Sequence, residues 1–140
     1  MSVYLGLDYG SVTCGIAIST SGILSSPLLT IRFEKDSAKA CVEKLLPIIS
    51  ENRVTDIVIG HPINMDDTLG ERSRKTEKLK TLLGEATSCN IYLQDERLTT
   101  LETKEIFRMT SNYKKKKKDK DMVSAMLILQ RFLDKKGMNG

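Results

Sequence analysis

The short apolar run at residues 56–60, Asp-Ile-Val-Ile-Gly, constrains the fold of this chain more than any other segment. A continuous apolar run of this length suits a strand that is buried on both faces of a sheet. Helical periodicity flanks it, because apolar residues recur at helical spacing at 36–50 and at 72–86. We therefore expect a layered α/β fold in which helices cover the sheet.

Three strand patterns precede the first helix. They lie at residues 3–9, 13–19 and 23–33, and Ser21-Gly22 supplies a turn signal between the last two. Pro27 indicates an edge strand or a bulge. Pro47 is expected to kink or shorten the helix at 36–50. Three successive strands at the start of the chain favour antiparallel pairing.

Strands and helices alternate in the rest of the chain. A strand pattern at 90–94 follows the helix at 72–86, and a further helix starts at Thr99, with Glu102 at capping-box spacing. The last helix opens at Asp121. Such alternation favours parallel strands with right-handed crossovers. The predicted fold is a mixed five-stranded sheet, three antiparallel strands plus two parallel ones, flanked by helices, with the first strand central.

Composition narrows the class of protein. The 140 residues are 40% hydrophobic and 29% charged, which fits one globular domain. Residues 1–4 carry no basic signal-peptide region, and no apolar run approaches the roughly 20 residues that span a bilayer. We expect a cytoplasmic protein with no membrane partner. Cys14, Cys41 and Cys89 show no metal-binding spacing and are expected to be reduced thiols.

The basic charge of the chain is concentrated in one segment. Residues 114–120 hold six lysines and one aspartate, a local charge of +5 within a net charge of +4. A dense patch favours a polyanion at that place, and a solvated loop is the alternative. Tyr113, beside the lysines, is the best candidate for stacking on a base. The lysines expected to contact nucleic acid are Lys114, Lys115, Lys116, Lys117 and Lys118.

Three carboxylates lie where secondary-structure elements meet loops. Asp8 lies near the end of the apolar strand at 3–9, Glu96 follows the strand at 90–94, and Asp121 opens the last helix. A carboxylate in an apolar setting costs free energy unless a cation or hydrogen bonds satisfy it. Acids from separate elements can hold two Mg²⁺ ions about 4 Å apart, which activate water and shield phosphate charge. The sequence predicts a Mg²⁺ or Mn²⁺ site on Asp8, Glu96 and Asp121 that acts on nucleic acid.

Each carboxylate also has a structural alternative. Asp8 could anchor the turn that follows it. Glu96 could pair with Arg97 or Arg72, and Asp95 competes for its role. Asp121 could be a simple acid at a helix N-terminus, worth roughly 0.3–1 kcal/mol through the helix dipole.

The remaining side chains that could take part in catalysis or metal binding give weaker functional signals than the three carboxylates. His61 is the only histidine, and we expect it to pack in the Gly60-His61-Pro62 turn, with a general-base role as the alternative. No second histidine or cysteine pair supports a zinc site. Tyr92 lies in a strand pattern and is expected to be structural.

Four motifs resemble the YqgF/RuvX family in their order and spacing. They are Leu5-Gly6-Leu7-Asp8-Tyr9-Gly10-Ser11, Gly60-His61-Pro62-Ile63-Asn64-Met65, Asp95-Glu96-Arg97-Leu98-Thr99-Thr100, and Asp121-Met122-Val123-Ser124-Ala125 with Ile128-Leu129-Gln130. The resemblance covers essentially the whole chain. It implies one RNase H-like nuclease domain over residues 1–140, related to the RuvC-type Holliday junction resolvases.

The resemblance also implies a function. It implies a bacterial cytoplasmic nuclease that matures the 5′ end of the 16S rRNA precursor, as a monomer or weak homodimer, with ribosomal proteins as further partners. Cleavage of branched DNA and non-catalytic RNA binding in ribosome assembly are the alternatives. The family's acidic residues fall on Asp8, Glu96 and Asp121, although Asp119 offers a second acid near Asp121.

Two further residues are assigned to nucleic-acid binding through the resemblance. The family's Gly-x-Pro-x-Asn motif places Asn64 in a loop near the active site, and Arg72 ends a segment that fits the family pattern. The chain departs from the family at residues 11–15, which lack the basic residue that relatives commonly carry there. The lysine segment is expected to compensate for that missing contact.

Overall fold

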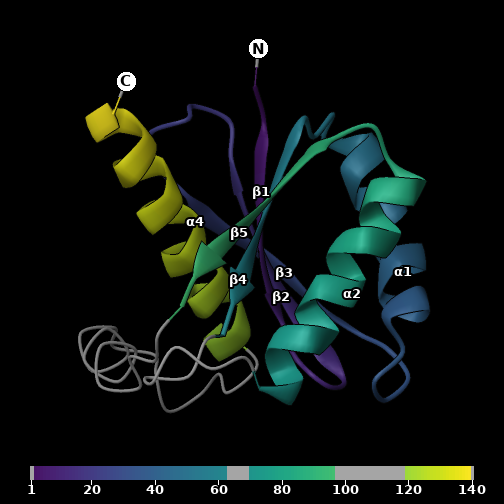
Figure 1. Ribbon diagram of the computed structural model, residues 1–140. Helices are drawn as coiled ribbons and strands as arrows, with labels where there is room; N and C mark the ends of the chain where they lie inside the picture. The colour runs from purple at the N-terminus through teal and green to yellow at the C-terminus, as the bar shows by residue number, and fades with distance from the viewer. Residues whose placement is uncertain (1, 63–69, 97–118, 140) are drawn as a thin grey trace.

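The structure, a computed structural model, describes residues 2–62, 70–96 and 119–139. Figure 1 shows a central sheet with helices on both faces. The helix expected from Thr99 lies outside the described residues. The described elements, in chain order, are β1 (Tyr4–Tyr9), β2 (Thr13–Ser19), β3 (Ser26–Arg32), α1 (Ala38–Glu51), β4 (Asp56–His61), α2 (Glu71–Ala86), β5 (Asn90–Asp95) and α4 (Asp119–Asn139).

The five strands form one mixed sheet in the order β3-β2-β1-β4-β5. The strand β1 pairs antiparallel with β2, and β2 pairs antiparallel with β3. The strand β4 lies parallel to both β1 and β5. The predicted sheet, with β1 at its centre, is therefore confirmed. Pro27 lies on the edge strand β3, opposite a register shift at Ile16/Ala17, as its missing N–H led us to expect.

Each face of the sheet has its own apolar layer. The helices α1 and α2 cover one face, and α4 covers the other (Figure 1). Because side chains alternate along a strand, neighbouring residues of β1 and β4 enter different layers. Leu5, Leu7, Ile57 and Ile59 belong to the α1/α2 layer. The α4 layer is built from Tyr4, Ala17, Val58, Ala125, Ile128, Leu129 and Leu133.

The helix α4 lies unusually close to the sheet. A Cβ atom on Gly6 would lie 2.6 Å from the Leu129 Cβ atom and 2.9 Å from the Ala125 carbonyl oxygen. A Cβ atom on Gly15 would lie only 1.9 Å from the Asp121 carbonyl oxygen. No real structure tolerates such distances, so glycine at these two positions is what lets the helix backbone reach the strands.

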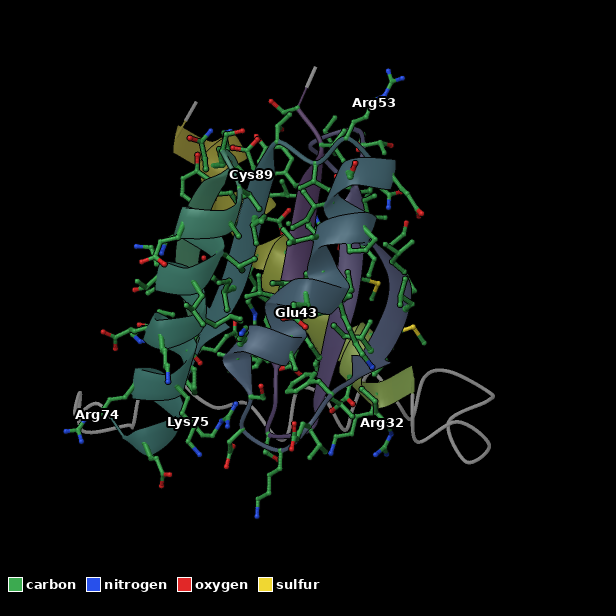
Figure 2. All side chains as sticks on the ribbon, turned by 90° about the vertical axis from the view of Figure 1, so that its right-hand side faces the viewer. Arg32, Glu43, Arg53, Arg74, Lys75 and Cys89 are labelled. Atoms are coloured by element: carbon green, nitrogen blue, oxygen red, sulfur yellow. The ribbon has the colours of Figure 1, made fainter. Side chains whose placement is uncertain are left out.

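Pro47 does not shorten α1, which continues to Glu51. Of the two expected effects, a kink or an early end, the early end does not occur, and the exposure of Pro47 explains why. The carbonyl that loses its helical partner belongs to Glu43, whose side chain Figure 2 shows on the outward face of α1, so water can satisfy it. The buried residues Leu45 and Ile49 hold the last turns against the sheet.

Two further boundaries differ from the sequence prediction. The strand β3 begins at Ser26 rather than at residue 23, and Ile23 and Leu24 are 71% and 69% exposed. The helix α4 begins at Asp119, two residues before Asp121. Among the described helices, none is long and apolar enough to cross a membrane.

Candidate active site

Alternation along β1 decides which face Asp8 occupies. Tyr4 and Gly6 point toward α4, whereas Leu5 and Leu7 point toward the other layer. Asp8 follows Tyr4 and Gly6 at a spacing of two residues, so its carboxylate lies on the same face as those two residues, toward α4 and near the end of the strand. The following turn is closed by the backbone, with the Gly10 N–H donating to the Thr13 carbonyl at 2.8 Å.

Glu96 reaches the same face from the parallel half of the sheet. It directly follows β5, and its backbone N–H donates to the His61 carbonyl at the end of β4, at 2.9 Å. A Cβ atom on Gly60 would lie 3.5 Å from Glu96 Cγ and would also meet Ile128 of α4. Glu96 therefore lies between the carboxyl end of β4 and α4. Asp95 lies one residue earlier and is exposed.

The basic partner of Glu96 comes from α4. Arg131 Nη1 donates to Glu96 Oε2 at 2.5 Å, and the two side chains are 29% and 19% exposed. The sequence offered Arg97 and Arg72 as partners. Arg97 lies outside the described residues, and Arg131 was missed because no motif marks a partner 35 residues away on another element.

Asp121 enters from the first turn of α4. Thr13 Oγ1 on β2 donates to Asp121 Oδ2 at 3.0 Å, and Gly15 lies against the Asp121 backbone. Its position near the N-terminus of a long helix suits a carboxylate, as expected from the helix dipole. The fold thus brings together Asp8, Glu96 and Asp121, which we call the acidic triad.

The charges of the acidic triad oppose one another. Burial is the largest cause that raises the pKa of Asp8, to about 6, and the negative charges of Asp121 and Glu96 contribute to the same increase. Arg72 and Lys120 act in the opposite direction. Crowded like charges favour either a bound proton or a bound cation. The site therefore has an excess of negative charge, which a bound cation would neutralise.

Arg72 is anchored beside the end of β1. Its Nη2 atom donates to the Tyr9 carbonyl at 2.7 Å, and the guanidinium carbon lies 5.3 Å from the centre of the Tyr9 ring. The side chain is still 37% exposed. Arg72 can therefore hold the turn after Asp8 and also present positive charge at the site. Figure 2 shows Lys75 and Arg74 at the same end of α2.

The remaining sequence candidates have structural partners. His61 is buried, and its Nε2 atom lies 3.2 Å from Glu77 Oε2 on α2, a contact that the sequence analysis missed. Tyr92 donates to Asp56 at 3.3 Å, so its expected structural role is confirmed. Cys14 is fully buried, and its pKa is raised well above the ordinary value by the Cys41 thiol and by burial.

The predicted nucleic-acid contacts on loops lie outside the described residues: Asn64, Tyr113, Lys114, Lys115, Lys116, Lys117 and Lys118. Within the parts of the chain that the structure describes, no group of three or more His, Cys, Asp or Glu side chains is arranged so that it could hold a metal ion without further ligands or movement of a side chain. The acidic triad is therefore not a closed cage. Its third member, Glu96, is held by Arg131 instead.

Comparison with known proteins identifies the class. The family model RuvX, described as Holliday junction resolvase, matches residues 2–135. The chain belongs to this family of nucleases, and it is accordingly a hydrolase.

Curated relatives agree over almost their full length. A protein of Ruminiclostridium cellulolyticum named "Putative pre-16S rRNA nuclease" is 42% identical over 132 residues, which covers 94% of this chain and 93% of the relative. A protein of Lachnospira eligens with the same name is 38% identical over 135 residues, which covers 94% of this chain and 96% of the relative.

A solved structure supports the fold. RuvC of Thermus thermophilus in complex with a Holliday junction substrate matches with a TM-score of 0.62 at 13% identity, which covers 98% of this chain and 96% of that chain. At this identity the likeness shows the fold alone. The predicted RNase H-like sheet is thereby confirmed.

Proposed function

We propose that this protein is a divalent-metal-dependent endonuclease that matures the 5′ end of the 16S rRNA precursor in the cytoplasm. The observation that carries the proposal is the acidic triad, three carboxylates from β1, the end of β5 and α4 on one face of the sheet. The names of the two relatives support precursor rRNA as the substrate. Both relatives match this chain along almost their whole length.

The residues fit a hard cation. Carboxylate oxygens are the ligands that Mg²⁺ and Mn²⁺ prefer, and Mg²⁺ is commonly held by one or two carboxylates plus substrate phosphates rather than by an all-protein cage. An open triad suits that mode of binding. Asp8 and Asp121 would hold the ion. Glu96 would become a third ligand if its carboxylate left Arg131 and bound the ion instead. A bound ion supplies an activated water and charge stabilisation at the phosphate.

The surrounding residues of this chain orient the reacting groups. Thr13 fixes one oxygen of Asp121 through its hydroxyl hydrogen bond. Arg72, held by the Tyr9 carbonyl, keeps a positive charge near Asp8 that can contact a substrate phosphate. Arg131 keeps Glu96 against α4. Together these contacts preorganise donors and acceptors around the bond to be cleaved.

Cleavage of branched DNA is the second candidate, and the RuvX description of the matching family favours it. One experiment separates the two candidates. The purified protein is incubated with labelled 16S precursor rRNA and with a four-way DNA junction, each with Mg²⁺ and with chelator. We expect metal-dependent cuts in the RNA alone. Cuts in the junction alone would assign the protein to recombination, and binding of RNA without cleavage would contradict the nuclease proposal.

Replacing Arg131 by Gln should increase the affinity for Mn²⁺. The substitution removes the positive charge that now contacts Glu96 Oε2, so a metal ion no longer competes with Arg131 for that carboxylate. The half-buried pair is lost at the same time, and the metal-free protein should lose about 1–2 kcal/mol of unfolding free energy. Titration calorimetry and urea denaturation measure the two effects. Arg74→Gln, at an exposed position of α2, is the control, and equal Mn²⁺ affinity in both variants would contradict the exchange.

A further inference from the structure

A groove with an excess of positive charge runs beside the edge strand β5. Its volume is about 720 Å³, and we call it the β5 groove. Figure 1 shows β5 at the front of the sheet, between α2 and α4. The side chains that line it are Lys80, Ile91, Tyr92, Leu93, Gln94, Phe132, Lys135 and Lys136.

Charge distinguishes this groove from its neighbour. Three of the lining residues are lysines, and none of the described lining residues is acidic. Lys80 and Lys135 are exposed, and no described carboxylate pairs with either of them. A second hollow of about 620 Å³ on the α2 side of β5 is lined by one acid, Glu77, and one lysine, Lys80, and so has no such excess. Of these two hollows, the β5 groove is the one that presents a concentrated positive charge to a polyanion.

Aromatic rings form part of the groove wall. Tyr92 and Phe132 pack with their centroids 4.9 Å apart, and both remain partly exposed. Tyr92 is held in place by Asp56, and Lys136 is held by the Tyr4 hydroxyl and ring. Fixed aromatic rings beside cations are the combination that holds bases and phosphates of a single strand. The modest volume suits a short stretch of single strand rather than a double helix.

The groove is continuous with the acidic triad. Arg131 and Lys135 lie four residues apart on α4, so they share one face of the helix. Arg131 contacts Glu96, and Lys135 lines the groove. On the strand, Gln94 lines the groove two residues before Glu96. A strand that leaves the acidic triad along β5 would therefore enter the groove directly.

We propose that the β5 groove binds a single-stranded segment of the nucleic acid next to the position of cleavage, through Lys80, Lys135 and Lys136. The proposal rests on the nuclease function for its position relative to the cut, but binding itself needs no cleavage. It adds a contact surface formed by α2, β5 and α4 to the lysines at 114–118 that the sequence singled out.

The test measures binding without catalysis. Anisotropy of a labelled oligouridylate is followed in chelator over a range of salt concentrations, with the full chain and with Lys80→Gln/Lys135→Gln. Single-strand contacts contribute about 0.7 each to the salt slope, so two lost contacts should lower it by about 1.4 and weaken binding about 25-fold near 0.1 M salt. Lys39→Gln/Lys78→Gln removes the same charge from exposed positions outside the groove and should bind within about twofold of the wild type.

Other outcomes are equally decisive. Equal weakening by both double variants would show a general charge effect and overturn the groove. An unchanged salt slope in the groove variant would also overturn it, and competition by duplex RNA as strong as by single strand would overturn the single-strand assignment. If the wild type cleaves no substrate but the groove variant alone loses binding, the nuclease proposal fails and the groove remains.

Discussion

Asp8→Asn should abolish cleavage while leaving nucleic-acid binding nearly intact. The negative charges of Asp121 and Glu96 both raise the pKa of Asp8, so Asp8 lies close enough to interact with each of the other two carboxylates. Loss of its charge removes several kcal/mol of transition-state stabilisation, which corresponds to a rate decrease of about a thousandfold or more. The rate of cleavage of labelled precursor rRNA with Mg²⁺ measures the effect. Asp95→Asn, one residue before Glu96 but exposed, is the matched control and should retain activity.

The same variant should be more stable than the wild type without metal at neutral pH. The pKa of Asp8 is about 6 in the folded protein and 3.8 without its environment, so folding favours the protonated form. Protonated Asp8 stabilises the folded protein fully below pH 3.8, and this stabilisation is lost as the pH rises through about 6. At pH 7 the ionised carboxylate costs on the order of 2 kcal/mol after allowance for partial solvent exposure.

Denaturation in chelator at several pH values measures this cost. The difference in unfolding free energy between Asp8→Asn and wild type should be largest at pH 7 and should shrink as the pH falls below about 6. Saturating Mg²⁺ should reduce it at pH 7, because the ion stabilises only the protein that binds it. A difference independent of pH would contradict the electrostatic explanation.

Gly15→Ala should cause the largest loss of stability. The new Cβ atom would lie 1.9 Å from the Asp121 carbonyl oxygen, a backbone atom that no change of rotamer can move. Either β2 or α4 must shift, and we expect a loss of more than about 3 kcal/mol and a fall in Tm of about 10 °C. Activity should fall as well, because the displaced backbone carries Asp121.

Gly84→Ala is the control for that substitution. A Cβ atom at Gly84 on α2 would meet only Ile91 Cδ1, at an ordinary 3.9 Å. Alanine in a helix interior is favoured over glycine by about 0.5–1 kcal/mol, so this variant should be slightly stabilised. Thermal unfolding by circular dichroism compares the two. A Gly15→Ala protein with wild-type Tm would contradict the close approach of α4 to the sheet.

The sequence predicted the sheet well because its signals are local. The apolar run at 56–60, the alternation at 13–19 and the period change after Phe33 each follow from which face of an element is buried. The placement of Asp8 and Asp121 also followed, since each belongs to a predicted element. The Arg131–Glu96 and His61–Glu77 contacts could not be predicted, because partner choice between distant elements depends on how the helices pack.

The effect of Pro47 on α1 also depends on tertiary packing that the sequence pattern does not give. Its ring removes one helical hydrogen bond wherever it stands, but the cost depends on whether the orphaned carbonyl meets water. Residue spacing alone does not give that exposure for a helix whose outward face is set by tertiary packing. The residues at 63–69 and 97–118, which contain most of the predicted nucleic-acid contacts, lie outside the described structure.

The acidic triad joins a residue of the first strand to a residue of the last helix, and this has a consequence for synthesis. A nascent chain contains Asp8 when little else has been translated, but it gains Asp121 only after the five described strands have been made. Until α4 docks against Gly6 and Gly15, the emerging polypeptide has no complete acidic triad. With the proposed metal site on the acidic triad, the order of the elements keeps the nuclease inactive on the translating ribosome until α4 has emerged.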